Sequence, residues 1–140
     1  MKILLATDGS NQGLKAARFL MKNPGILGSK PDVLVLNVDL PLGRSLTTEV
    51  GVEAADRYHA ESSEMAMRST LALFKRAGVP CRAVALTGDP ATIIAHVAKS
   101  KHRQMIVMGS HGHGTLGRLL LGSVTAKTMS LSEVPVLVVR

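Results

Sequence analysis

Short runs of apolar residues, separated by segments with helical character, constrain the fold of this chain more than any other feature. Strands are predicted over residues 2–7, 32–38, 81–87, 104–108 and 136–140. In most of these runs apolar side chains occupy successive positions, so both faces of the strand must be buried. Strands of this kind that alternate with helices predict a parallel sheet with a helical layer on each face.

The segments between the strands carry signals for helix starts and ends. Helices are predicted over residues 12–22, 51–77 and 123–131, and a further helix begins at Pro90. Asp89 suits the position that caps this further helix, and proline suits its first turn. The polar segment 39–50 contains Pro41 and Gly43 and is predicted to be a loop.

The long helix 51–77 is predicted to pack through a stripe of small, only partly apolar residues. The stripe consists of Val52, Ala55, His59, Ser62, Ala66, Thr70, Leu73 and Ala77. Methionines are predicted to fill gaps in the core, because their side chains are unbranched and flexible. Those assigned to the core are Met65, Met67, Met105, Met108 and Met129.

The order of the strands follows from the two loops that combine polar residues with glycine. These loops follow the first and the fourth predicted strands, at residues 7–10 and 109–123. Ligands of parallel sheets bind at the carboxyl ends of strands where the strand order reverses, so strands one and four are expected to be neighbours. With right-handed crossovers, the prediction is a single domain over residues 1–140. It is an α/β protein, a three-layer α/β/α sandwich with a five-stranded parallel sheet in the order 3-2-1-4-5.

The loop Gly109–Ser123 reads GSHGHGTLGRLLLGS and leads from a buried strand to a predicted helix. Unpaired backbone amides and the helix dipole at such a position favour phosphate. Its glycines are predicted to let the backbone approach a ligand and to adopt positive φ angles. The loop fits neither a Walker motif, because Ser123 stands where the lysine belongs, nor the dinucleotide fingerprint of a first strand. A flexible surface loop without a ligand is the alternative interpretation.

Charge and composition restrict the partners of the chain. The net charge of +7 suggests anionic ligands, although a merely solubilising basic surface explains it equally well. Aromatic residues make up only 2% of the chain and the basic residues are scattered, which argues against nucleic acid. No apolar run reaches the ~20 residues of a membrane span. With one cysteine, Cys81, and no export signal, a cytoplasmic protein without an internal disulfide is expected.

Several segments together resemble the universal stress protein family. They are the opening KILLATDGS, the segment Val97–Gly109, the spacing of Gly109, Gly112 and Gly122-Ser123, and the closing PVLVVR. One departure is the segment 101–104 (KHRQ), where the family more often carries an aspartate near the strand start. The resemblance covers essentially the whole chain. It implies an adenine nucleotide alpha hydrolase-like fold with the strand order inferred above.

The glycine spacing is typical of the ATP-binding branch of that family, so the resemblance implies ATP as the ligand. It places Ala6, Thr7 and Asp8 against the adenine and ribose, and the backbone of Val38 against the base. Around the ribose and phosphates it places Met108, Gly109, His111 and Gly112. At the helix start, it assigns the phosphates to Gly122, Ser123, Val124 and Thr125. The implied function is that of a nucleotide-dependent stress-response or signalling module.

Some side chains near these segments have two interpretations. Asp8 suits ribose hydroxyls or a Mg²⁺ ion shared with the phosphates, and it equally suits an Asx-turn or a helix cap. For His111 and His113 the sequence offers no third zinc ligand nearby, so phosphate contact or simple exposure is favoured over zinc. Arg118 and Lys127 suit either phosphate neutralisation or a solvated surface.

Other function classes are a slow ATP hydrolase, a nucleotidyl- or phosphoryl-transfer enzyme, and a flavin carrier. Neither a Ser/His/Asp set nor a carboxylate pair is apparent in the sequence, so no catalytic residue is assigned and at most weak ATPase activity is expected. A flavodoxin-like carrier is disfavoured by the scarcity of aromatic side chains that would sandwich the flavin.

The last predicted strand is apolar throughout and lies at an edge of the predicted sheet. An exposed apolar edge promotes aggregation unless another strand pairs with it. The sequence therefore predicts a homodimer that is joined through this C-terminal strand.

Overall fold

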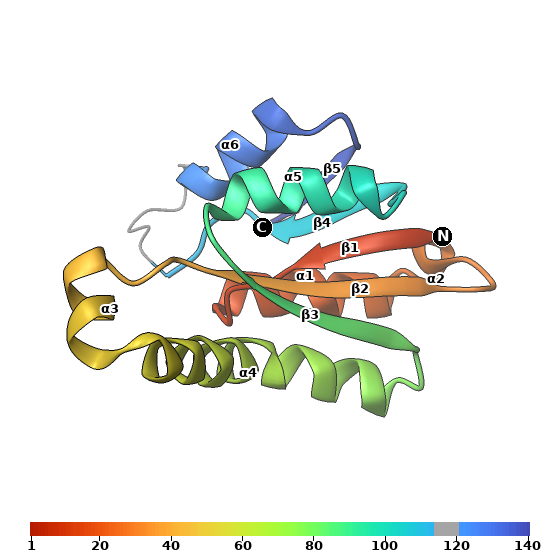
Figure 1. The fold of residues 1–140 in the computed structure, drawn as a ribbon. Coiled ribbons are helices and arrows are strands. Elements are labelled where there is room, and N and C mark those ends of the chain that lie inside the picture. The colour runs from red at the N-terminus through yellow and green to blue at the C-terminus, as the bar shows by residue number, and fades with distance from the viewer. Residues whose placement is uncertain (114–120) are drawn as a thin grey trace.

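The computed structural model describes residues 1–113 and 121–140 (Figure 1). Its strands are β1 (Lys2–Ala6), β2 (Asp32–Asp39), β3 (Cys81–Thr87), β4 (Met105–Gly109) and β5 (Val136–Val139). All neighbouring strands are parallel, and their order is β3-β2-β1-β4-β5. The predicted strand order is confirmed, and each predicted strand is found with ends shifted by one residue at most.

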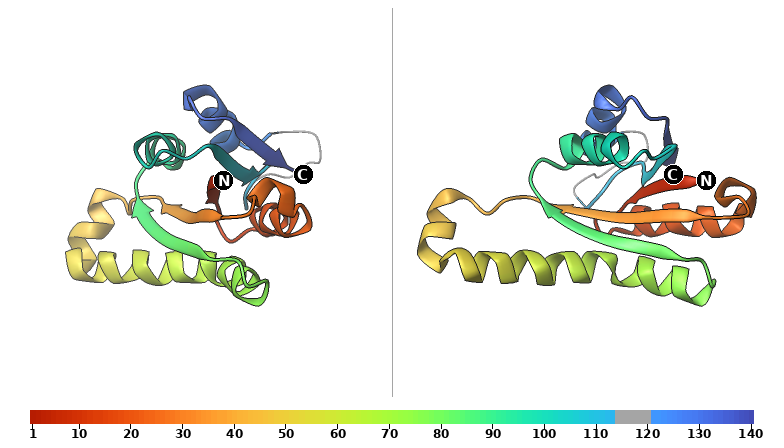
Figure 2. Two further views of the ribbon diagram at one scale, coloured as in Figure 1. Left: turned by 90° about the vertical axis from the view of Figure 1, so that its right-hand side faces the viewer. Right: turned by 45° about the vertical axis from the view of Figure 1, so that its right-hand side comes forward.

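Helices cover both faces of the sheet, as predicted (Figure 2). On one face lie α1 (Asn11–Lys22), the short α2 (Pro24–Leu27) and α4 (Val52–Arg76), and on the other α5 (Pro90–Ser100) and α6 (Ser123–Leu131). Within the described residues, no helix combines the length and the apolarity that crossing a bilayer requires.

Each face of the sheet has its own apolar core. Ile3 and Val33 belong to the cluster that packs against α1 and α4, whereas Leu4 and Leu34 belong to the cluster that packs against α5. Neighbouring residues of a strand point to opposite faces. This is why the central strands are apolar at successive positions.

The prediction that residues 39–50 form a loop is wrong in two places. β2 continues through Asp39, and Arg44–Val50 form a helix, α3, which projects beyond the sheet in Figure 1. This helix lies between Gly43 and Gly51 and buries none of its residues. Because it presents no apolar stripe to the core, hydrophobic periodicity does not reveal it.

The long helix α4 is found where it was predicted, but it packs through a partly different face. Its buried residues are Ala55, Ser63, Met67, Thr70 and Phe74. Only Ala55 and Thr70 of the predicted stripe are among them. The prediction followed the small residues, whereas Met67 and Phe74 bury the larger apolar area and therefore decide which face turns inward.

Two of the methionines assigned to the core lie on the surface instead. Met65 and Met129 are 68% and 48% exposed. Both are on solvent-facing sides of their helices, where a single apolar side chain is common. Met67 and Met108 are buried as predicted.

An ion pair joins the starts of β2 and β4, at the edge of the sheet where the strands begin. The side chain of Arg103 is 5% exposed, and its Nη1 lies 3.1 Å from Asp32 Oδ1. Arg82 Nη2 donates to the same oxygen at 2.9 Å. The hydrogen bonds from Arg103 and then Arg82 hold the pKa of Asp32 below its ordinary value. Arg103 belongs to the segment 101–104 that departs from the family pattern.

We expect Asp32→Asn to lower the free energy of unfolding at neutral pH by roughly 1–3 kcal/mol, the range for hydrogen bonds to charged groups. The wild-type contribution is fully present above the unfolded-state pKa of aspartate, about 3.9. It is lost as the pH falls through the lower folded-state pKa. Urea unfolding from neutral to acidic pH measures this difference.

The exposed pair of Lys99 and Glu133 supplies the control, because Glu133→Gln should change stability by less than about 1 kcal/mol. The difference between wild type and Asp32→Asn should shrink at acidic pH. A difference that stays constant down to the acid transition would contradict the assigned role of the Asp32 carboxylate.

Candidate functional site

A cavity of about 410 Å³ opens at the carboxyl ends of β1, β2 and β4. β2 and β4 lie on opposite sides of β1, so the cavity sits where the strand order reverses. Every residue predicted to contact a ligand lines it: Ala6, Thr7, Asp8, Val38, Met108, Gly109, His111, Gly112, Gly122, Ser123, Val124 and Thr125. The cavity has the size of a small-molecule site.

Some lining residues were not predicted from the sequence. They are Gly13, Leu36, Leu40, Pro90 and Ile94, and His113 completes the lining. Leu36 could have been found, because it shares a face of β2 with Val38. Pro90 and Ile94 come from the first turns of α5, and only the folded chain shows that this helix begins beside the cavity.

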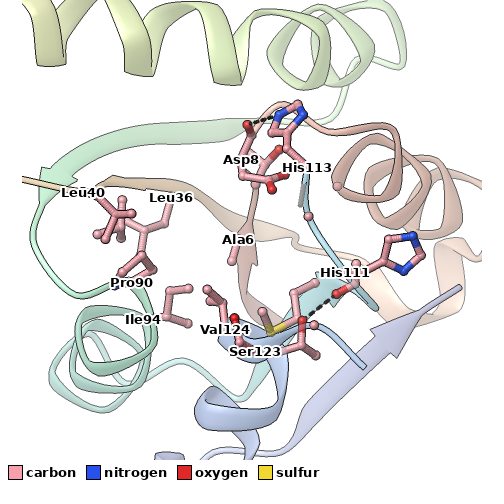
Figure 3. Close-up of a pocket in the computed structure, with 18 residues that line it drawn as sticks. Ala6, Asp8, Leu36, Leu40, Pro90, Ile94, His111, His113, Ser123 and Val124 are labelled. Atoms are coloured by element: carbon pink, nitrogen blue, oxygen red, sulfur yellow. Dashed lines mark hydrogen bonds between the residues drawn. The ribbon is translucent and has the colours of Figure 1, made fainter. Parts of the chain in front are cut away.

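The cavity has an apolar side and a polar side (Figure 3). Leu36, Leu40, Pro90, Ile94 and Val124 gather around the apolar side. On the polar side are the turn after β1, the loop after β4 and the start of α6. No Lys or Arg is among the described residues that line it.

The turn after β1 is tightly hydrogen-bonded. The Thr7 amide donates to the Leu36 carbonyl at 3.0 Å and so extends the β1–β2 ladder by one bond. Asp8 Oδ1 accepts from the Ser10 amide at 3.0 Å, which makes an Asx-turn. Ser10 Oγ in turn accepts from the Gly13 amide and caps α1. The Asx-turn interpretation of Asp8 is therefore correct, and the Asx-turn itself uses only one of the two carboxylate oxygens.

Two loop glycines are required by contacts within the protein. A Cβ atom on Gly112 would collide with Asp8 Oδ2, and one on Gly122 would lie 2.9 Å from the His111 Cα. The predicted positive φ angles are not found at Gly109, Gly112 or Gly122. A side chain is disfavoured at Gly112 by the nearby Asp8 carboxylate and at Gly122 by the nearby His111 backbone, not by an unusual φ. Gly114, Gly117 and Arg118 lie outside the described residues.

Among the described residues, no side chain caps the N-terminus of α6. The Gly122 amide donates to the Ser110 carbonyl at 2.8 Å, so this amide is satisfied by the protein. The first bond of the helix comes from the Ala126 amide. The amides of Ser123, Val124 and Thr125 therefore have no acceptor within the helix, and they lie where the helix dipole places partial positive charge.

Thr125 has a structural role in addition to its place in the lining. Its Oγ1 donates to the Gly109 carbonyl at 3.0 Å, and the residue is 3% exposed. This bond fixes the start of α6 to the end of β4. The hydroxyl proton is consequently engaged, so only the amide of Thr125 remains to donate to a ligand.

The two loop histidines face different neighbours. The His111 ring points away from the cavity toward α1 in Figure 3, where it lies 3.2 Å from Gln12 Nε2 and 3.0 Å from Ser110 Oγ. His113 Nε2 lies 3.0 Å from the Asp8 carbonyl oxygen. Across residues 1–113 and 121–140, His, Cys, Asp and Glu form no group of three or more that could hold a metal ion.

An ion pair joins the N-terminal cap of α5 to the middle of α6. Lys127 Nζ lies 2.9 Å from Asp89 Oδ1. Asp89 also caps α5, because its Oδ2 accepts from the Thr92 amide at 2.9 Å. The hydrogen bonds from Thr92 and Lys127 lower the pKa of Asp89 to about 2. Lys127 is thus engaged by a carboxylate, which favours the surface interpretation over phosphate neutralisation.

The sequence of the whole chain decides the family. Residues 1–140 match the family model described as the Universal stress protein family. The chain belongs to the universal stress protein family. A universal stress protein of Thermus aquaticus is 34% identical over 139 residues, which is 99% of this chain and 97% of that protein.

Solved structures show the same fold in other proteins. One from Methanocaldococcus jannaschii superposes with a TM-score of 0.79 and 28% identity, over 99% of this chain and 94% of that one. A universal stress protein family protein from Arabidopsis thaliana, described with AMP bound, gives a TM-score of 0.69 and 18% identity. That match covers 99% of this chain and 90% of that one. The predicted fold and the predicted family are both confirmed.

We expect Gly122→Ala to lower the free energy of unfolding by about 1–3 kcal/mol, as overpacking does. The backbone of Gly122 suits alanine, with φ −62° and ψ 149°, so the effect measures the close contacts of the added Cβ with His111 and Ser110. Gly43→Ala is the matched control because nothing lies within 4 Å of its Cβ position. Urea unfolding of both variants gives the comparison, and equal stabilities would show that Gly122 is not needed for packing.

Proposed function

We propose that this protein binds an adenine nucleotide, ATP, in the cavity at the carboxyl edge of the sheet. Acting through that nucleotide, it serves as a stress-response or signalling module. The observation that carries the proposal is the uncapped start of α6, whose amides border the same cavity as a set of apolar side chains. One side of the cavity suits phosphates and the other a planar base.

The start of α6 is suited to phosphate oxygens. The amides of Ser123, Val124 and Thr125 have no acceptor within the helix, and the Ser123 hydroxyl lies beside them in the lining. Amides at a helix start bind phosphate without a cationic side chain. This matches a lining whose described residues include no Lys or Arg.

The end of β2 is suited to the edge of a base. β1 pairs with β2 only as far as Leu36, whereas β2 continues to Asp39. The stretch around Val38 therefore has no paired β1 residue beside it, and among the described residues no backbone hydrogen bond occupies its groups on that side, which suits a ligand. Ala6, Leu36 and Met108 line the cavity nearby and supply apolar contacts for an adenine ring.

The Asp8 carboxylate is the reason to expect that binding of the nucleotide at the proposed site requires Mg²⁺. Its Oδ1 completes the Asx-turn, and its Oδ2 lies against Gly112 at the polar side of the cavity. A carboxylate beside phosphates repels them unless a cation lies between, and carboxylate plus phosphate oxygens is the usual donor set for Mg²⁺. We therefore assign ATP with Mg²⁺ as the ligand. The AMP-bound protein of the same fold supports the adenine nucleotide class.

We expect Ser123→Asp to weaken binding of ATP by about tenfold or more, because a carboxylate at this position repels the phosphates. The same charge favours the helix dipole, so the variant should be as stable as wild type or slightly more stable. Calorimetric titration with ATP in the presence of Mg²⁺ measures the affinity. Adenosine, which lacks phosphate, should bind both proteins equally.

Ser130→Asp is the matched control, since Ser130 is exposed near the other end of α6. It adds the same charge to the same helix and should leave the affinity unchanged. Wild type that binds none of AMP, ADP and ATP at millimolar concentration would remove the proposed function. Equal losses in the two variants would remove the phosphate from the start of α6.

The proposed assembly is a homodimer that forms through β5, and the proposed location is the cytoplasm. β5 is an edge strand, and its residues Val136–Val139 are all apolar and only half-buried. A parallel or antiparallel partner strand would satisfy the open edge.

Cys81 is half-buried, and burial raises the pKa of its thiol, which favours the unreactive protonated form.

We expect sedimentation velocity at micromolar concentration to give the mass of a dimer. Val138→Lys should shift the protein toward the monomer, because a charged residue on an edge strand opposes pairing with a second strand. Ala83→Lys on β3, the other edge strand, is the matched control, because Ala83 is exposed and receives the same charged side chain, and it should leave the dimer intact. A clean monomer of the wild type would contradict the proposed assembly.

A further inference from the structure

Asn37 is a buried amide on a strand whose other inward positions are apolar. Val33 and Val35 precede it on the same face of β2 and belong to the core beneath α1 and α4. Asn37 is 5% exposed. Burying an amide is unfavourable unless it is hydrogen-bonded. An asparagine at this buried position is therefore expected to have a hydrogen-bond partner.

The partner is the carbonyl oxygen of Thr7, which accepts from Asn37 Nδ2 at 2.9 Å. Asn37 Oδ1 is buried and has no partner among the described residues. An apolar side chain would avoid that unsatisfied oxygen. The single bond to Thr7 is thus the interaction that the Asn37 amide contributes.

This bond lies at the point where β1 turns away from the sheet. The last paired residues of β1 and β2 are Ala6 and Leu36. After them the Thr7 amide bonds to the Leu36 carbonyl, and the Thr7 carbonyl bonds to Asn37. The two bonds hold both sides of the Thr7 residue to β2, and the chain then leaves the sheet as the turn that carries Asp8.

The rest of the turn lies close to two neighbouring elements. A Cβ atom on Gly9 would lie 2.9 Å from the Ala66 Cα of α4, and one on Gly112 would meet Asp8 Oδ2. The turn therefore contacts α4 on one side and the loop after β4 on the other. A shift at Thr7 would move the Asp8 carboxylate relative to that loop.

We propose that Asn37 is a positioning residue for the nucleotide site, and this rests on the proposed function. It contacts the turn from the α1/α4 face of the sheet, whereas the cavity lies on the α5/α6 face. By fixing the Thr7 carbonyl, it sets the direction of the Thr7–Ser10 turn. That direction places the Asp8 carboxylate beside the phosphate end of the ligand.

The first test is the affinity for ATP with Mg²⁺ in Asn37→Leu and Asn37→Asp. Both variants keep the approximate size of the side chain and remove the donor, and both should bind about tenfold more weakly, the equivalent of one hydrogen bond. Ser63→Ala is the matched control, because Ser63 is a polar residue 2% exposed on the adjacent α4. It should bind like wild type. Titrations are run at a temperature where circular dichroism shows every variant folded.

A double-mutant cycle separates positioning from a general loss of stability. If Asn37 acts through the turn, Asn37→Leu should weaken binding in the wild type but have little further effect in Asp8→Ala. Ser63→Ala combined with Asp8→Ala should be additive. Additive losses for Asn37 and Asp8 would overturn the proposal.

Amide hydrogen exchange tests the same claim without a ligand. The Gly9 amide donates to Thr7 Oγ1 at 3.3 Å and the Ser10 amide to Asp8 Oδ1 at 3.0 Å, so both report on the turn. Asn37→Leu should speed their exchange about tenfold and leave the amides of α5 unchanged. If wild type binds no nucleotide, the proposed function fails while exchange still decides whether Asn37 holds the turn. Unchanged exchange at Gly9 and Ser10 would show that it does not.

Discussion

Two segments that are distant in the chain meet at the carboxyl edge of the sheet, and both line the site. The turn after β1 and the loop after β4 touch where the Asp8 carboxylate lies against Gly112. Their strands are neighbours in the sheet, and the helices that follow them go to opposite faces. The cavity lies where the chain leaves β1 toward one face and β4 toward the other, so its position follows from the strand order.

In the part of the chain that the structure describes, the start of α6 is held by other bonds than a side-chain cap. The helices after β1 and β3 are capped by the side chains of Ser10 and Asp89. At α6 the fixing bonds run instead from the Gly122 amide to Ser110 and from the Thr125 hydroxyl to Gly109. These bonds anchor the helix to β4 without occupying the amides of its first turn. An anchored but uncapped helix start is what a phosphate site requires.

The sheet could be predicted from the sequence because strands that are buried on both faces have apolar residues at successive positions, and this pattern is visible in a short segment. The cavity walls at Asp8 and Ser123 could be predicted because turn and helix-start residues are also local. The helix α3 could not be predicted from the sequence, because it buries none of its residues. The sequence also does not predict a role at the site for Leu40, Pro90 and Asn37. Each of them reaches the site through contacts between segments that are distant in the chain. The buried face of α4 differs from the predicted one for a related reason. Met67 and Phe74 are buried because they pack against the sheet, and this contact also joins distant segments.

Among the described residues that line the cavity, backbone dipoles and not lysine or arginine side chains supply the positive potential. Lys127, the described cation closest along the chain to the start of α6, is paired with Asp89, whose pKa of about 2 keeps that carboxylate ionised at physiological pH. Helix amides lie at fixed positions and do not have to be reoriented when an anion arrives, whereas a lysine would have to leave its partner first. The net charge of +7 therefore contributes to the long-range attraction of anions, which salt screens. The short-range contacts at α6 depend far less on ionic strength. Binding through such contacts needs an accurately placed turn and loop, and this is why packing residues such as Gly112 and Asn37 matter to a site that they do not chemically resemble.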